Sequence, residues 1–172
     1  MNVFLVGPMG SGKSAVGRQL AQRLALEFID SDAEIEARTG VDIAYIFERE
    51  GEAGFRSREA EVIDALSRRD RVLVSTGGGA ILDASTRERL RARGRVVYLR
   101  TSVDQQLART RRSNDRPLLN NDDPRGTLER LFEQRAPLYT EVAEIVVDTD
   151  GRKVKAVVDQ ICHQLGIDGV EP

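Results

Sequence analysis

A glycine-rich segment directly after a short apolar run constrains the fold of this chain more than any other feature. Residues 7–14 read GPMGSGKS, which matches the pattern of a glycine, any four residues, a glycine, a lysine and a serine. The apolar run at residues 3–6 is typical of a buried strand, and residues 15–26 have the apolar periodicity of a helix. Strand, glycine loop and helix in this order predict a phosphate-binding loop.

Each residue type in this loop has a physical reason to be there. Glycines such as Gly10 and Gly12 allow backbone N–H groups, that of Ser11 included, to surround a phosphate, and the helix N-terminus adds partial positive charge. Lys13 is placed to reach the outer phosphates of a nucleotide, and Ser14 to hold Mg²⁺. A plain glycine-rich turn before a helix is the alternative, and the agreement of motif and context favours the phosphate-binding loop.

The composition indicates one globular domain over residues 1–172, with 40% hydrophobic and 31% charged residues and a net charge of −2. Because there is no overall basic field, we expect no binding to nucleic acid or to a membrane surface. The chain opens directly into a predicted strand, and no apolar run reaches membrane-spanning length, so we expect a cytoplasmic enzyme. Cys162 and His163, each the only residue of its type, exclude an intramolecular disulfide and a cysteine or histidine metal cluster.

Predicted strands and helices alternate along the chain, which indicates an α/β fold with a five-stranded, mainly parallel sheet covered on both faces. A polar, arginine-bearing segment at about 110–124 breaks the alternation, and a loop of this length in a compact domain is typically disordered or a functional lid. We predict strands at 3–6, 27–29, 72–74, 95–99 and 145–147, and helices at 15–26, 33–38, 41–69 with a bend at 51–54, 83–93, 102–110, 125–139 and 154–165.

Ligands of open parallel sheets bind at the carboxyl ends of the strands, and polar or glycine residues follow two of these predicted strands. Asp30 and Asp32 follow the second strand, and they face the same side if the extended conformation continues through Ser31. One carboxylate would then help to hold Mg²⁺, and the other would accept a hydrogen bond or a proton from an attacking hydroxyl. The alternative is that Ser31 or Asp32 caps the next helix. Three glycines, Gly77, Gly78 and Gly79, follow the third strand.

Three arginines are candidates for binding an anionic substrate or a transferring phosphate. Arg56 begins a predicted helix and has Glu59 at one-turn spacing, where a pair contributes only a few tenths of a kcal/mol. Arg135 precedes the helix-breaking Pro137 and could equally be a surface charge. Arg116, in the predicted lid, is placed to stabilise charge on a transferring phosphoryl group.

Taken together, these segments resemble the shikimate kinase family, P-loop enzymes that transfer a phosphoryl group from ATP to the 3-hydroxyl of shikimate on the chorismate route to aromatic amino acids. The resemblance covers nearly the whole chain. It implies a three-layer α/β/α P-loop kinase fold, a substrate-binding subregion at about 32–60, a mobile lid, Mg²⁺ with ATP as co-substrate, and a monomer. It rests on an ordered set of segments: 7–14, 30–32, Phe55 and Arg56 with Glu59, 77–79, 116–119, and Arg135 with 137–139.

The resemblance also implies roles for single residues. Asp32 would orient or deprotonate the attacking hydroxyl, while Arg56 and Arg135 would pair with the substrate carboxylate. Backbone N–H groups of the three glycines at 77–79 would face the substrate. For the nucleotide, Arg116 would touch the transferring phosphate and the substrate together, and Arg109 and Arg152 would flank adenine.

Two departures from the usual pattern concern the nucleotide side of the site. Ala15 stands where the family usually has a hydroxyl residue, which predicts modestly weaker ATP binding. The third strand ends in Ser75 rather than in an acidic residue, so metal ligands are expected from Ser14 and Asp30. The alternatives are a kinase for another small hydroxylated acid such as gluconate, a nucleoside monophosphate kinase, or a non-catalytic nucleotide-dependent switch.

Overall fold

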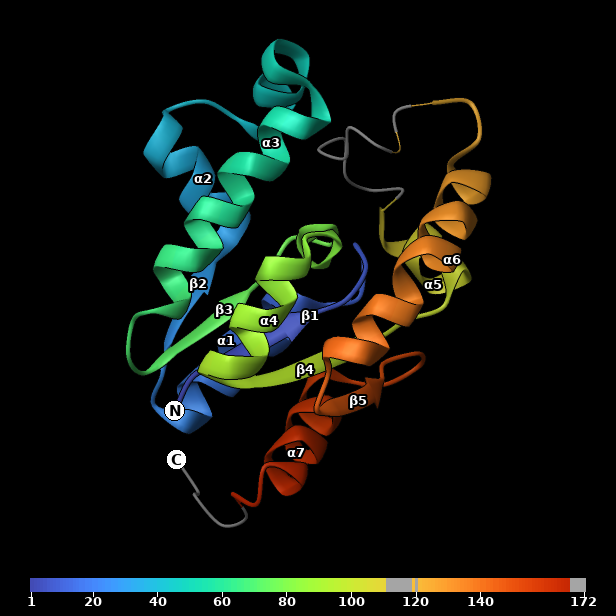
Figure 1. The fold of residues 1–172 in the computed structure, drawn as a ribbon. Helices are drawn as coiled ribbons and strands as arrows, with labels where there is room; N and C mark the ends of the chain where they lie inside the picture. Colours follow the sequence, from blue (N-terminus) through green and yellow to red (C-terminus); the bar gives the residue numbers. More distant parts are fainter. Residues whose placement is uncertain (111–118, 120, 168–172) are drawn as a thin grey trace.

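A computed structural model of the chain describes residues 1–110, 119 and 121–167. Its sheet has five strands in the order β2-β3-β1-β4-β5, and all four neighbouring pairs are parallel (Figure 1). The predicted parallel α/β sheet is therefore confirmed, and each strand lies within one residue of its predicted bounds. The strands are β1 Val3–Val6, β2 Glu27–Asp30, β3 Val72–Ser75, β4 Arg95–Arg100 and β5 Ile145–Asp148.

Helices connect the strands, as the alternating pattern predicts. The bend predicted within 51–54 lies at Gly51, whose φ of 73° and ψ of −179° are non-helical and divide α3 into two parts. The helices are α1 Lys13–Leu24, α2 Ser31–Thr39, α3 Ile43–Ser67, the short 3₁₀ helix η1 Ala80–Leu82, α4 Ala84–Arg93, α5 Val103–Thr110, α6 Pro124–Val142 and α7 Val154–Gln164.

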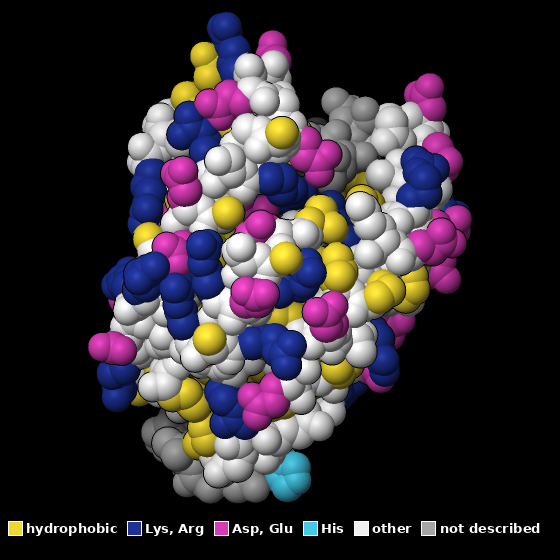
Figure 2. All heavy atoms as spheres, in the orientation of Figure 1, with side chains coloured by type: hydrophobic (Ala, Val, Ile, Leu, Met, Phe, Trp, Pro, Cys, Tyr) yellow, Lys and Arg dark blue, Asp and Glu magenta, His cyan; other side chains and the backbone are white. Residues whose placement is uncertain are grey.

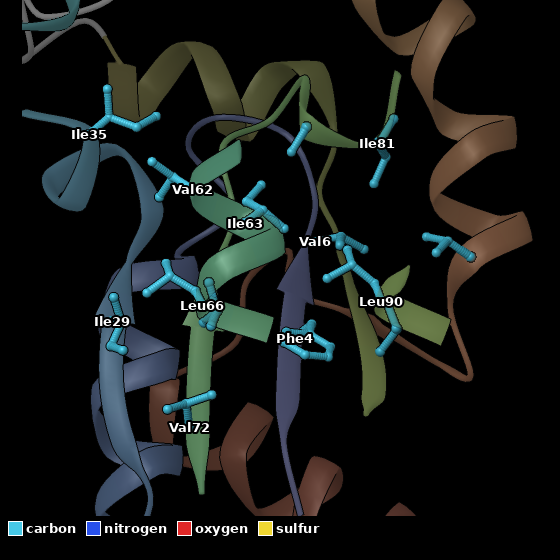
Figure 3. Packing of buried hydrophobic residues seen from close by; sticks show 14 of the residues in the cluster. Phe4, Val6, Ile29, Ile35, Val62, Ile63, Leu66, Val72, Ile81 and Leu90 are labelled. Atoms are coloured by element: carbon cyan, nitrogen blue, oxygen red, sulfur yellow. The ribbon is translucent and has the colours of Figure 1, made fainter. Parts of the chain in front are cut away.

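The sheet is the middle layer of three. Alternate side chains of β1 face opposite sides: Phe4 and Val6 pack with α3, α4 and α6, whereas Val3 and Leu5 pack with α1 and α7. Figure 3 shows the first of these cores, where Leu66 of α3 lies over the strands. Two buried cores fix the strand ends in place, and the loops that follow the strands are therefore held on a rigid base.

The segment after β2 differs from expectation. The helix begins at Ser31 rather than at 33, because Asp30 is its N-cap: Asp30 Oδ1 accepts the backbone N–H groups of Asp32 at 2.9 Å and of Ala33 at 3.1 Å. The extended conformation does not continue through Ser31, so the alignment of Asp30 and Asp32 along one strand face is wrong. The alternative, a cap at Ser31 or Asp32, is wrong as well.

A second difference concerns the end of α6, which continues to Val142 rather than ending at 139, although the helix-breaking residue Pro137 lies inside it. An interior proline costs a helix about 3 kcal/mol. Beyond it, Tyr139 and Val142 are buried in the core over Tyr98 of β4, and this burial holds the last turn in place. Tertiary packing therefore overrides the helix-breaking tendency of the proline.

Basic and acidic side chains are interspersed over the face shown in Figure 2, which carries α3, α4 and α6. Ion pairs on this side include Arg93 Nη1 with Asp64 Oδ1 at 2.6 Å. In the described part of the chain, no helix has the combined length and apolar character that crossing a membrane requires.

Candidate active site

A cleft of about 970 Å³ lies at the carboxyl ends of β1, β2 and β3. The loop between β1 and α1, the start of α2, both halves of α3, the loop after β3, the end of α5 and one residue of α6 all line it. The structure thus brings together residues that are far apart in the sequence. Those for which the sequence analysis predicts a role in the site are Gly10, Gly12, Lys13, Ser14, Ala15, Asp30, Asp32, Arg56, Gly77, Gly78, Gly79, Arg109 and Arg135.

The loop between β1 and α1 has the backbone that a phosphate cradle needs. Gly10 and Gly12 have φ values of 76° and 87°, in the left-handed region that favours glycine. Ser11 between them is buried. The ammonium of Lys13 donates to the carbonyl oxygens of Gly7 at 2.7 Å and Pro8 at 2.8 Å. The lysine therefore lies folded along its own loop, at the N-terminal end of α1.

A hydroxyl and a carboxylate meet beside this loop. Ser14 Oγ donates to Asp30 Oδ2 at 3.3 Å, while Oδ1 of the same aspartate caps α2. Mg²⁺ prefers oxygen ligands and is typically held by one or two side chains together with phosphate oxygens and waters. The pair of Ser14 and Asp30 fits that donor set. Among the described residues there is no group of three or more His, Cys, Asp or Glu side chains that could form a metal site by itself.

The opposite side of the cleft contains a buried ion pair. Arg56 Nη1 donates to Glu59 Oε1 at 2.8 Å, and the Glu59 side chain is only 2% exposed. Burial raises the pKa of Glu59 to about 7, with a smaller contribution from the nearby Asp32 carboxylate and opposing effects of Arg56 and Arg135. Arg56 pairs with Glu59 as predicted. Because the Glu59 carboxylate is buried, however, the small energy expected for an exposed pair on a helix does not apply to it.

The three glycines after β3 pack against these charged groups with no room for side chains. A Cβ on Gly77 would lie 2.5 Å from Glu59 Oε2 and 3.0 Å from Asp32 Oδ1, and one on Gly79 would overlap the Arg56 guanidinium. The Gly77 N–H group donates to Ser31 Oγ at 3.1 Å and thereby connects the loop to α2. The prediction that backbone N–H groups face the substrate therefore rests mainly on Gly78 and Gly79.

Arg135 is the second cation on this side. Its side chain is 3% exposed, so the alternative of a surface charge near a helix end is wrong. Arg135 Nη1 would lie 3.4 Å from a Cβ on Gly78, and the Tyr139 hydroxyl, one turn further along α6, donates to the Gly78 carbonyl. Burial raises the pKa of Tyr139, which stacks on Tyr98 at a centroid distance of 4.9 Å. Helix α6 thereby fixes the glycine loop beside its own arginine.

The three arginines assigned to the nucleotide have different outcomes. Arg109 lines the cleft and donates from Nη1 to the Gly10 carbonyl at 3.0 Å. Arg152 is not among the described residues that line the cleft; its guanidinium donates to the carbonyls of Asp148 at 3.0 Å and Ala156 at 3.2 Å, and its role near adenine stays a prediction. Arg116 lies outside the described residues.

Sequence reasoning missed two residues, one in the cleft and one behind the phosphate-binding loop. Glu59 was treated only as a partner of Arg56, although its spacing from Phe55 and Ile63 places it on the apolar face of α3, and a glutamate on such a face is a signal of a buried charge. Gln106 of α5 was not considered, yet its Nε2 donates to the backbone carbonyl of Met9 at 2.9 Å. Nothing in the local sequence indicates that contact.

Comparisons with known proteins agree with one another. The family model described as shikimate kinase matches residues 9–166. A shikimate kinase of Shewanella amazonensis is 56% identical over 165 residues, which are 96% of each chain. The structure of a shikimate kinase from Acinetobacter baumannii in complex with shikimate has a TM-score of 0.94 at 46% identity, and the match covers 99% of this chain and 95% of that one. A shikimate kinase structure from Aquifex aeolicus has a TM-score of 0.84 at 36% identity, with 96% of each chain covered.

Proposed function

This chain belongs to the shikimate kinase family, and we propose that its cleft transfers the γ-phosphoryl group of ATP to the 3-hydroxyl of shikimate. The observation that carries this proposal is the pair of cations Arg56 and Arg135 beside Asp32, facing a phosphate-binding loop across one cleft. A small anionic polyol needs a cationic clamp for its carboxylate and an acceptor for its hydroxyl. The product is shikimate 3-phosphate.

The loop at 7–14 binds the phosphates of ATP. Backbone N–H groups from Gly10 to Ser14 surround the β- and γ-phosphates at the N-terminus of α1. Lys13, which lies along the loop carbonyls, exchanges these for the outer phosphate oxygens and neutralises charge as the bond to the leaving oxygen lengthens. Arg109, beside Gly10, borders the nucleotide, and the absence of a hydroxyl at Ala15 removes one side-chain contact.

Ser14 and Asp30 would hold Mg²⁺, because their adjacent oxygens are the ligands this ion prefers. When bound, the ion supplies charge neutralisation at the β- and γ-phosphates. Asp30 also caps α2, so the same carboxylate positions the helix that carries Asp32. Metal binding and substrate positioning thus share one side chain.

On the acceptor side, Arg56 and Arg135 pair with the shikimate carboxylate, and Asp32 accepts the hydrogen bond of the attacking hydroxyl. As the oxygen forms its bond to phosphorus, the hydroxyl proton passes to Asp32 and the bond between phosphorus and the ADP oxygen breaks. Positioning and electrostatics supply most of the rate enhancement. Arg116, outside the described residues, is the proposed cation that touches both the transferring phosphate and the substrate. The proposed enzyme is a monomer that acts in the cytoplasm.

Two variants separate these roles. Asp32→Asn keeps the size of the side chain but removes its charge, so kcat should fall by a factor of about 100 or more with a smaller change in the KM for shikimate. Arg56→Ala should mainly raise that KM, by about tenfold or more. Steady-state kinetics with ³¹P NMR identification of the product tests both. Unchanged shikimate kinetics in the Arg56→Ala enzyme would show that Arg56 does not bind the substrate carboxylate.

A further inference from the structure

Gln106 lies behind the active-site cleft, on the face of α5 that contacts the phosphate-binding loop. Its side chain is 2% exposed, and its Nε2 donates to the Met9 carbonyl at 2.9 Å. The orientation of the amide follows from chemistry, since a carbonyl can only receive an N–H group. The Oε1 atom therefore faces away from Met9.

Two buried polar atoms near this point have no hydrogen-bond partner among the described residues. One is the acceptor Gln106 Oε1, and the other is the donor Nε of Arg135, whose side chain is 3% exposed. Leaving such buried groups without a hydrogen-bond partner is unfavourable. Both residues line the same small cavity between α5, α6 and the loop. An acceptor without a donor and a donor without an acceptor thus border one space.

The size of the cavity identifies what fits there. Its volume is about 10 Å³, about the space that one water molecule needs when two or more polar groups hold it. We propose that Gln106 is a positioning residue that links the phosphate-binding loop to Arg135 through a single buried water, bonded to Gln106 Oε1 and Arg135 Nε. The other lining residues are Pro8, Met9, Leu128, Leu131, Phe132 and Tyr139. The Tyr139 hydroxyl already donates to the Gly78 carbonyl, so the water has few competing partners.

This link has a consequence for the reaction and rests on the proposed function. Met9 and Arg135 line both the small cavity and the main cleft. Gln106 is not among the described residues that line the main cleft, yet it fixes the loop backbone on one side and the orientation of a guanidinium on the other. The nucleotide side and the carboxylate clamp are thereby connected at the back of the cleft.

A crystal structure of the wild-type chain tests the water directly. We expect density for one water within about 3.2 Å of both Gln106 Oε1 and Arg135 Nε. A direct bond between these two atoms, or a cavity without a water that contacts both, would overturn the proposal. This readout needs neither a variant nor an active enzyme.

Binding measurements test the positioning role. Gln106→Leu removes both polar contacts at similar volume, and we expect it to weaken shikimate binding in the presence of Mg·ADP by about fivefold. Arg135→Lys keeps the charge but lacks Nε, so adding Gln106→Leu to it should weaken binding by less than about twofold more. Independent, additive losses would show that Gln106 does not act through Arg135.

Gln134→Leu is the matched control, because it makes the same change at an exposed position next to Arg135. By itself it should leave the shikimate affinity at the wild-type value, and when added to Arg135→Lys it should leave the affinity at the value of Arg135→Lys alone. A wild-type chain that fails to bind shikimate would contradict the proposed function, whereas the buried water would still decide the link between Gln106 and Arg135. The two failures are therefore distinguishable.

Discussion

Replacing the buried carboxylate of Glu59 with an amide tests the electrostatics of the acceptor side. Glu59 is 2% exposed, and burial raises its pKa from the ordinary 4.5 to about 7 despite its bond to Arg56. This difference corresponds to about 3 kcal/mol between the folded and unfolded states. Glu59→Gln keeps the shape of the side chain and removes its titration.

The direction of the pH dependence of stability follows from whether Glu59 loses its proton first in the folded or in the unfolded state. Because the pKa of Glu59 is higher in the folded state, the unfolded chain releases this proton first as the pH rises. The stability that neutral Glu59 contributes is fully present below pH 4.5 and is lost as the pH rises through about 7. The free energy of unfolding of Glu59→Gln, relative to wild type, should therefore increase by about 3 kcal/mol from about pH 4.5 to about pH 8.

Urea unfolding of both proteins across this pH range measures the difference, and other titrating groups largely cancel between them. Glu52→Gln is the matched control: Glu52 Oε1 also pairs with Arg56, at 3.4 Å, but its side chain is 50% exposed. A relative free energy for Glu59→Gln that does not change with pH would refute the desolvation argument. So would an equal change in the Glu52→Gln control.

Two further predictions concern the nucleotide loop and the glycine loop. Ala15→Thr restores a hydroxyl at the start of α1 and should tighten ATP binding by about threefold, a gain typical of one added hydrogen bond. An unchanged affinity in an ATP titration would show that the hydroxyl missing at position 15 does not weaken ATP binding. Gly79→Ala would place a Cβ against the Arg56 guanidinium. Since the φ of Gly79 is −98°, the backbone accepts alanine, and the expected result is a KM for shikimate raised by about tenfold at nearly constant melting temperature. A shikimate KM equal to that of wild type would show that the Arg56 side chain can move away from the added methyl group without weakening substrate binding.

The elements that local sequence determines were predictable. Phosphate-binding loops have a fixed motif between strand and helix, and fully buried parallel strands such as Val72–Ser75 are continuous apolar runs with clear ends. The bend at Gly51 also follows from a single residue. Because the apolar pattern and the flanking residues agree for each strand, the predicted strand bounds differ from the observed ones by one residue or less.

Features that depend on distant contacts were not predictable in the same way. Asp30 caps α2 and also contacts Ser14, and only the fold brings these groups together. Pro137 stays helical because residues beyond it are buried against another element. Glu59 is buried because α3 packs its apolar face on the sheet beneath the glycine loop. In each case the tertiary environment, rather than the local preference, decides the outcome.

The central claim is that this cleft phosphorylates shikimate at the expense of ATP. The direct measurement is ADP release by the purified chain with shikimate, gluconate and nucleoside monophosphates as separate acceptors, with Lys13→Met as the inactive reference. We predict release that depends on shikimate and falls by about 1,000-fold in Lys13→Met while the melting temperature shows a folded protein. Release supported by gluconate or a nucleoside monophosphate but not by shikimate would contradict the account.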